Sequence, residues 1–342
     1  MTAQNSRIKE IDILYSIGAI LAIFGHSHPN NWSSFEGTLF YHCIVFIYTF
    51  HMALFFFVAG VLLIYSKSIE TKPFGTFIKE KALKLLTPYL VLTVLAFIPK
   101  GYLEHRSFEF INVKFIVSAL FNPRENTWGH FWFLPVLFIC YILFGLLKKS
   151  ISKLDTNVQI VILSVCVLVF ALFVLYPPFN TDWFGINDIF HFAFYIPFGM
   201  LLGNLNQKHV KIKISHVIPP LCSVVLLMLA VLGYVFFYND VLARFTISLL
   251  MIFSLLSIAF SLRNKLENIF GFLSKNIFTV YIYSWPFQSV ALIVLEKLGL
   301  SWEICAPVMF VTGTLCPLIL IGTYKRFKKL NSPFFDLVLG IR

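Results

Sequence analysis

Residues Ile11–His28 read IDILYSIGAILAIFGHSH, an almost continuous apolar run that contains one acid near its start and two histidines at its end. Arg7 and Lys9 precede the run, and the loop that follows it contains neither Lys nor Arg. An apolar run with basic residues on one side only is typical of a membrane helix whose basic end faces the cytoplasm. The sequence therefore predicts a membrane-spanning first helix with imidazoles at its outer end, where function is to be sought.

The composition extends this prediction to the whole chain. The 342 residues are 58% hydrophobic and only 13% charged, more apolar surface than one soluble core could bury. Each crossing takes about 20 residues, so about ten helices fit with short connections. Runs such as Val158 to Tyr176 are almost continuously apolar and do not alternate as barrel strands would. We predict an all-α, polytopic membrane helix bundle that forms a single integral-membrane domain over residues 1–342.

The expected helices follow the apolar runs, and the basic residues orient them. Most of the 27 Lys and Arg residues fall in alternate connections, which predicts that both termini are cytoplasmic and the number of crossings is even. The connection from Lys100 to Gly129 has an apolar middle and could form an interfacial or re-entrant helix. The expected helices lie near residues 11–27, 41–65, 83–99, 130–147, 157–176, 188–204, 216–238, 242–262, 276–295 and 303–324.

Several classes of function are disfavoured by the sequence. The formal charge of +11 comes from short basic groups between apolar runs, which indicate membrane topology and not a nucleic-acid partner. The six cysteines have no paired spacing, so we interpret them as packing residues. No HExxH, GxSxG, P-loop or GxGxxG motif occurs, which argues against zinc hydrolysis, a hydrolase serine and bound nucleotide. We expect no metal and no bound cofactor.

Histidines are the candidate chemical groups. His26, His51, His130 and His191 are expected in the outer half or at the outer ends of helices, where an ionisable group is costly and therefore a functional candidate. Imidazole titrates near neutrality and can accept a proton from a hydroxyl group. Each ring could instead serve only as a hydrogen-bond partner between helices. The basic stretch Lys72–Lys84 could contact anionic lipid or bind a phosphate-rich donor, and the sequence favours neither use.

Five segments occur in order along the chain: DILYSIGAILAIFGHS at Asp12–Ser27, FIYTFHMALFFFVAG at Phe46–Gly60, KALKLLTPYL at Lys81–Leu90, GHFWFLPVLF at Gly129–Phe138 and SKNIFTVYIYSWPFQ at Ser274–Gln288. Taken in this order, they resemble acyltransferase family 3, which comprises ten-helix bacterial membrane acyltransferases. Within that family they most resemble the fucose 4-O-acetylase-like branch.

The resemblance implies transfer of an acyl group, usually acetyl from cytoplasmic acetyl-CoA, to a hydroxyl of a surface or envelope carbohydrate. The family's proposed catalytic histidine falls on His26. The sequence departs from the family pattern at three positions. A basic residue eleven positions before the histidine is Tyr15 here, the proline of the FHMP segment is Ala53, and a frequent histidine of the ninth helix is Ser284.

Together these observations predict an O-acyltransferase in the bacterial inner membrane. Its partners would be membrane lipid, acyl-CoA as co-substrate and a polysaccharide or lipid-linked glycan. The rival predictions are a transporter or flippase for a lipid-linked sugar or acyl donor, and a structural partner in a polysaccharide synthase complex. Direct transfer and an acyl-enzyme both remain open. The candidate residues are His26 and His51 for catalysis, Arg7, Lys9, Tyr15, Lys81 and Lys84 for the donor, and His130, Trp132, Tyr281, Ser284 and Gln288 for the acceptor chamber.

Overall fold

The computed structural model describes residues 8–103, 117, 121–126, 128–179, 181–207, 220–262, 264–265, 267–327 and 332–340. Within these ranges the regular structure is helical and no strand occurs, so the all-α prediction is confirmed. The chain divides into two compact units. The first unit comprises Met1–Val58 and Lys211–Asn331, and the second comprises Ala59–Val210 and Ser332–Arg342.

Several helices are suited to a membrane. In the described part of the chain, six helices are long and apolar enough to cross a bilayer, or seven if the bent pair Trp183–Phe192 and Tyr195–Asn206 counts as one span. The first helix, at 17 residues, is shorter than the helices of that set. The prediction of about ten crossings is therefore compatible with the structure but not confirmed by it. The six spans are Leu39–Tyr65, Gly129–Ile151, Thr156–Leu175, Val241–Leu262, Ile269–Lys297 and Trp302–Arg326.

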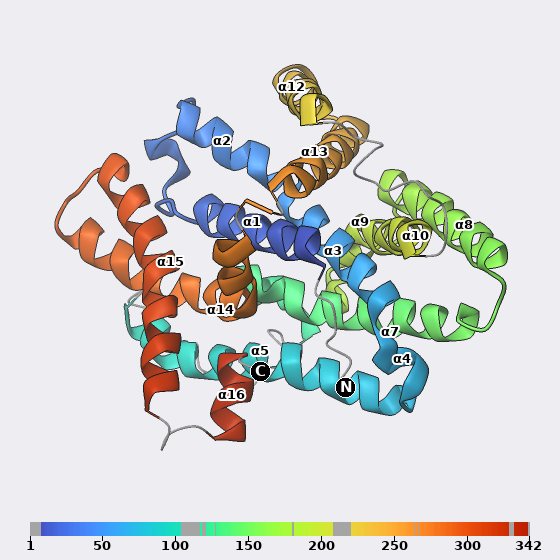
Figure 1. Cartoon of the computed structure of the whole chain (residues 1–342). Coiled ribbons are helices and arrows are strands. Elements are labelled where there is room, and N and C mark those ends of the chain that lie inside the picture. The colour runs from blue at the N-terminus through green and yellow to red at the C-terminus, as the bar shows by residue number, and fades with distance from the viewer. Residues whose placement is uncertain are drawn as a thin grey trace. The chain divides into compact units, whose positions relative to one another are not determined.

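The first unit is built around its N-terminal helix, α1. Figure 1 shows α1 against α14, and the two helices are in contact. Helices α2, α13 and α15 also contact α1, while α12 pairs with α13 and α14 pairs with α15. The bounds are α1 (Lys9–Gly25), α2 (Leu39–Tyr48), α12 (Pro220–Phe237), α13 (Val241–Leu262), α14 (Glu267–Lys297) and α15 (Trp302–Arg326), with a short 3-10 turn η1 (Trp32–Ser34) between α1 and α2.

The second expected helix counts as one span, Leu39–Tyr65, but its regular α-helix is interrupted within the apolar run. Helix α2 ends at Tyr48, and α3 (His51–Tyr65) begins after two intervening residues. At the break, the Thr49 amide and hydroxyl both bond to the Phe46 carbonyl, at 3.1 and 2.7 Å. This hydroxyl competes with the backbone for a carbonyl and favours a tighter turn. The break sets His51 at the start of a new helix.

The second unit contains the rest of α3 and the central helices of the chain. Helix α5 begins at Phe74, earlier than expected. The expected bounds followed the apolar run, whereas the helix also includes the charged residues that precede that run. Helix α16 was not predicted; Ser332 caps it by accepting a hydrogen bond from the Phe335 amide. The bounds are α4 (Lys67–Thr71), α5 (Phe74–Leu103), η3 (Pro123–Glu125), η4 (Gly129–Trp132), α7 (Phe133–Ile151), α8 (Thr156–Leu175), η5 (Trp183–Gly185), α9 (Ile186–Phe192), α10 (Tyr195–Gln207) and α16 (Pro333–Leu339).

Helices α3 and α10 approach each other unusually closely at Gly60. A Cβ atom added there would lie 2.1 Å from the carbonyl oxygen of Ile196. Glycine is the one residue that permits this backbone approach, which is the way small residues bring membrane helices together. Gly60 therefore determines how closely two helices of the second unit pack.

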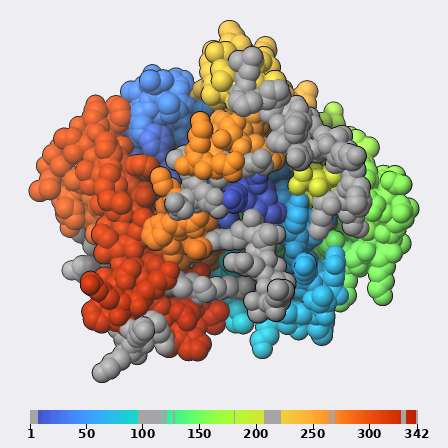
Figure 2. Space-filling model, viewed as in Figure 1, coloured from blue at the N-terminus to red at the C-terminus, as the bar shows by residue number. Residues whose placement is uncertain are grey.

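Large apolar side chains remain exposed on several helices. Figure 2 shows side chains of α8 in green and of α15 in red at the surface of the molecule. Leu168 of α8 is 67% exposed and Ile319 of α15 is 62% exposed. Exposed apolar faces of this kind suit contact with lipid chains. Most of the expected re-entrant stretch between Lys100 and Gly129 lies outside the described residues, and so does Arg7.

Candidate active site

His26 lies at the C-terminal cap of α1 and is half-buried. Its backbone amide donates to the Ala22 carbonyl at 3.1 Å, which continues the helix to this residue. The C-terminal end of a helix carries partial negative charge and stabilises a positive group such as imidazolium. The ring centroid of His26 lies 6.4 Å from that of His51 and 5.2 Å from that of Trp285. The two predicted catalytic histidines are therefore neighbours in the first unit.

His51 is the first residue of α3 and is only 5% exposed. Its Nδ1 atom lies 3.0 Å from the Ile47 carbonyl oxygen. Because a carbonyl oxygen can only accept, Nδ1 must carry the proton, and the lone pair of the neutral ring is then on Nε2. The break between α2 and α3 thus fixes the orientation of this second imidazole.

Tyr48 links the end of α2 to the end of α1. Its hydroxyl donates to the Gly25 carbonyl at 2.6 Å and lies 3.3 Å from both His26 Nδ1 and His28 Nε2. Its ring also lies near His51, with centroids 5.4 Å apart. Neither Tyr48 nor Trp285 was among the predicted site residues. The position of Tyr48 three residues before His51 was the signal that could have indicated it.

Gln288 fastens α14 to the C-terminal end of α1. Its amide nitrogen donates to the Ile23 carbonyl at 2.9 Å and to the Ser27 hydroxyl oxygen at 2.8 Å. The opposite amide orientation would set two acceptor oxygens against each other, so this assignment follows from the contacts. The remaining amide oxygen, Oε1, is buried and forms no hydrogen bond within the described residues. A buried acceptor of this kind is suited to a hydroxyl of a ligand.

Gly313 of α15 makes room for Gln288. A Cβ atom at position 313 would lie 2.7 Å from Cγ and 2.9 Å from Cδ of Gln288. We expect Gly313→Ala to lower the free energy of unfolding by about 1–3 kcal/mol, because the packed amide has to move. Thermal denaturation in detergent measures this loss. Gly322→Ala is the control on the same helix, since its Cβ would meet nothing within 4 Å; an equal loss in both variants would contradict the prediction.

Four other predicted residues that the structure describes lie in the first unit. The Ser284 hydroxyl is buried and donates to the Tyr281 carbonyl at 2.7 Å, so its proton is engaged within α14. The Tyr281 and Phe55 rings have centroids 5.7 Å apart, and the Phe55 and Tyr15 rings 5.8 Å apart. Phe55 thus contacts both predicted tyrosines. Lys9 is the first residue of α1.

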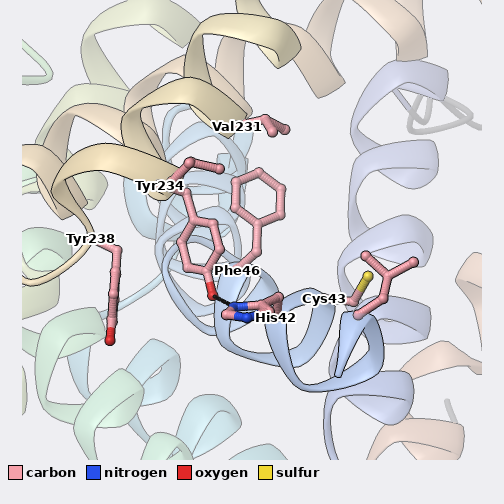
Figure 3. A pocket seen from close by; sticks show the side chains of 8 residues that line it. His42, Cys43, Phe46, Val231, Tyr234 and Tyr238 are labelled. Carbon is pink, nitrogen blue, oxygen red and sulfur yellow. Dashed lines mark hydrogen bonds between the residues drawn. The ribbon is translucent and has the colours of Figure 1, made fainter. Parts of the chain in front are cut away.

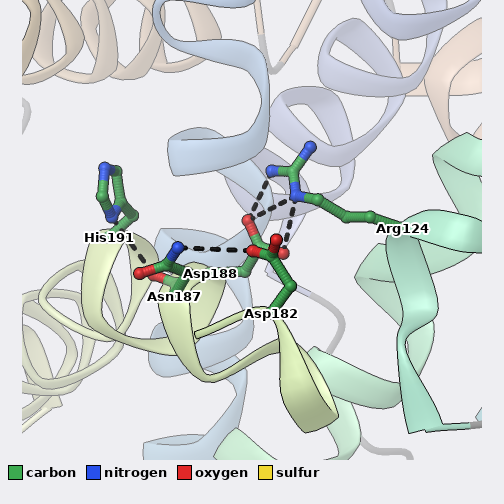
Figure 4. Close-up of polar contacts among 5 residues, drawn as sticks. All are labelled: Arg124, Asp182, Asn187, Asp188 and His191. Atoms are coloured by element: carbon green, nitrogen blue, oxygen red, sulfur yellow. Dashed lines mark hydrogen bonds and ion pairs between the residues drawn. The ribbon is translucent and has the colours of Figure 1, made fainter. Parts of the chain in front are cut away.

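The other predicted acceptor residues belong to the second unit. His130 and Trp132 are buried in η4, and the His130 ring packs on Phe131 at a centroid distance of 4.6 Å. The Arg124 guanidinium stacks over Trp132 at 4.5 Å and pairs with the buried Asp188, with Nε 2.9 Å from Oδ2 (Figure 4). A stacked, paired arginine beside an indole forms a rigid polar surface.

Around that ion pair, the short helix α9 and the turn before it supply further polar groups. Figure 4 shows Asp182 and Asn187 beside Asp188, with the Asn187 amide donating to Asp182 at 3.3 Å. His191 is exposed, and its Nδ1 lies 3.1 Å from the Asn187 carbonyl oxygen. This imidazole is therefore oriented by its own helix.

Two of the predicted donor lysines, Lys81 and Lys84, lie in the second unit. Lys81 Nζ lies 3.8 Å from the centroid of the Tyr141 ring and 5.4 Å from that of Phe77, a cation–π arrangement. Lys84 follows one turn later on α5 and is half-buried. Both therefore present positive charge on α5.

An apolar groove lies on the surface of the first unit between α2 and α12. It has a volume of about 440 Å³, and Figure 3 shows Phe46, Val231 and Tyr238 along it. Its polar contact is between His42 Nδ1 and the Tyr234 hydroxyl, 3.1 Å apart. Within the described residues, no group of three or more His, Cys, Asp or Glu side chains could hold a metal ion.

A comparison with protein families identifies the family to which the chain belongs. A family model described as an acyltransferase domain matches residues 8–324, nearly its whole length. The chain belongs to acyltransferase family 3. Membership of acyltransferase family 3, together with the apolar helices, makes this a multi-pass membrane protein with the general activity of an acyltransferase. No match was found among curated proteins or among solved structures.

Proposed function

We propose that this family 3 protein is an O-acyltransferase of the bacterial inner membrane. It would transfer an acyl group, most simply acetyl, from cytoplasmic acyl-CoA to a hydroxyl of an envelope carbohydrate. The observation that carries this proposal is the neighbouring pair His26 and His51, 6.4 Å apart by ring centroids, in a chain of this family. A pair of imidazoles at the end of a membrane helix supplies the base that an alcohol acceptor needs.

In the proposed reaction, His26 acts as the general base. Its Nε2 takes the proton of a sugar hydroxyl while the hydroxyl oxygen attacks the thioester carbonyl carbon of acyl-CoA. The new C–O bond forms, the C–S bond breaks, and the proton passes from His26 to the departing CoA thiolate. The reaction consumes one alcohol and one acyl-CoA and yields one ester and the free thiol of CoA. Holding donor and acceptor together out of water lowers the barrier further.

The environment of His26 supports this role. The C-terminal end of α1 favours the positive imidazolium formed when the proton is taken. The buried Gln288 oxygen can accept a hydrogen bond from a neighbouring hydroxyl of the same sugar. His51 lies close enough to assist, with its own lone pair on Nε2. These residues all belong to the first unit.

Recognition of the donor is a separate part of the proposal. Lys81 and Lys84 would bind phosphates of CoA, and Lys9 would add positive charge at the start of α1. On the acceptor side, the half-exposed Arg124 guanidinium, held over the buried Trp132 ring, would donate hydrogen bonds to sugar hydroxyls. The acceptor would be a polysaccharide or a lipid-linked glycan, and the protein would contact membrane lipid along its exposed apolar helices.

Glycan analysis tests the proposed function. We expect surface glycans from a strain lacking the gene to be lighter than wild-type glycans by one acyl group, and expression of the protein in that strain to restore the mass. Purified protein in liposomes should also transfer radiolabel from acetyl-CoA to the glycan. Movement of labelled glycan across the liposome membrane with no new ester would show a transporter instead.

A further inference from the structure

Tyr48 is placed to determine which nitrogen of His26 carries the proton. It is the last residue of α2, and its hydroxyl lies within hydrogen-bonding distance of three groups at the end of α1. These are the Gly25 carbonyl at 2.6 Å, His26 Nδ1 at 3.3 Å and His28 Nε2 at 3.3 Å. The ring centroids of Tyr48 and His26 are 5.6 Å apart.

The number of protons available around Tyr48 determines which atom donates in each of its contacts. A phenol has one proton, and the shortest contact gives it to the Gly25 carbonyl, which can only accept. In any further hydrogen bond the Tyr48 oxygen can therefore only accept. His26 Nδ1 satisfies this requirement if it carries the proton of the neutral ring.

His28 does not supply a competing proton. Its Nδ1 lies 2.8 Å from the Pro29 carbonyl oxygen, so Nδ1 must donate there and Nε2 carries the lone pair of the neutral ring. Burial lowers the pKa of His28, with the Pro29 hydrogen bond acting in the opposite direction, so this loop histidine is neutral near pH 7. With a lone pair on each atom, the 3.3 Å contact between His28 Nε2 and the Tyr48 oxygen is not a hydrogen bond, and the proton that Tyr48 accepts comes from His26 Nδ1.

We propose that Tyr48 is a positioning residue that holds His26 in the Nδ1–H tautomer, with its lone pair on Nε2. This inference rests on the proposed function, in which Nε2 takes the hydroxyl proton. The same hydrogen bond then serves the imidazolium, since Nδ1–H continues to donate to Tyr48 while Nε2 holds the extra proton. The arrangement has the form of a base oriented by a third group.

The Tyr48 ring packs directly against the backbone of Gly25. A Cβ atom at position 25 would lie 2.9 Å from Cε1 of Tyr48, closer than side chains approach one another. Because residue 25 is a glycine, no side chain of α1 occupies the volume that the Tyr48 ring fills. This contact is independent of the hydrogen bonds and holds the ring beside His26.

Tyr48→Phe removes the hydroxyl and keeps the ring, and Tyr41→Phe makes the same chemical change elsewhere on α2. In Tyr48→Phe we expect kcat for acyl transfer to fall about tenfold, the effect of one net hydrogen bond, with KM for donor and acceptor unchanged. Nitrogen NMR of ¹⁵N-histidine-labelled protein reports the tautomer directly. His26, assigned by comparison with a His26→Asn sample, should show Nδ1–H in wild type and in Tyr41→Phe, and mixed tautomers in Tyr48→Phe.

The two readouts separate this inference from the proposed function. An unchanged His26 tautomer in Tyr48→Phe, or an Nε2–H tautomer in wild type, would overturn the role of Tyr48 whatever the activity. The expected tautomer change in a protein that transfers no acyl group would support the positioning contact and reject the proposed reaction. A rise in KM with unchanged kcat would make Tyr48 a binding residue and would also overturn the inference.

Discussion

Replacing His26 with asparagine is expected to lower the rate of acyl transfer by a factor of about 10² to 10⁴, the usual contribution of a general base. The amide nitrogen of asparagine can occupy the position of Nδ1 and keep the hydrogen bond to Tyr48, while the basic Nε2 is lost. The variant should therefore insert and fold as wild type does. Transfer of radiolabel from acetyl-CoA to glycan by purified protein in liposomes measures the rate.

His191→Asn is the matched control for this experiment. It makes the same substitution at an exposed histidine on α9, whose Nδ1 is engaged by its own helix at the Asn187 carbonyl. We expect its transfer rate to equal that of wild type. If His26→Asn, present at normal level in the membrane, were as active as His191→Asn, His26 would not be the base.

Gly60→Ala is expected to have the largest effect on folding. The added Cβ would lie 2.1 Å from the Ile196 carbonyl oxygen and 2.9 Å from its Cα, and backbone atoms cannot rotate out of the way. Helices α3 and α10 would have to separate, at a cost of about 3 kcal/mol or more. We expect little folded protein to be recovered, as measured by size-exclusion chromatography of detergent extracts.

Gly203→Ala tests the same pair of helices at a position with room. The nearest atoms to its Cβ would be those of the Ile64 side chain, at 3.4 Å or more, which is ordinary contact. This variant should be recovered at the wild-type level. Equal recovery of the Gly60 and Gly203 variants would show that the close approach at Gly60 is not required for folding.

Much of the architecture could be predicted from hydropathy because a membrane helix needs a long apolar run. The limits of α8 and α13 agree closely with the expected residues 157–176 and 242–262. The break between α2 and α3 was not predicted, since Thr49 and Phe50 do not interrupt the apolar run. The turn depends on which carbonyl the Thr49 hydroxyl contacts, and hydropathy does not contain that information.

The site was predicted in part. His26 and His51 are predicted site residues because imidazole is costly in a membrane, and they are neighbours in the structure. The contact of Gln288 with Ile23 and Ser27 joins residues more than two hundred positions apart, so no local pattern indicates it. Tyr48 was missed because it lies inside the apolar run expected as one helix over residues 41–65, where the sequence does not indicate that its hydroxyl contacts the end of α1. Whether the predicted residues bind donor and acceptor remains a prediction.

The contact between Gly25 and the Tyr48 ring has a consequence for how such sequences diverge. A methyl group at position 25 and a six-membered ring at position 48 cannot occupy the same volume. A substitution at one position therefore has to be compensated at the other, and residues 25 and 48 should covary among homologues. A distant homologue with a larger residue in place of the glycine should have lost the aromatic ring as well, and with it this way of orienting its histidine.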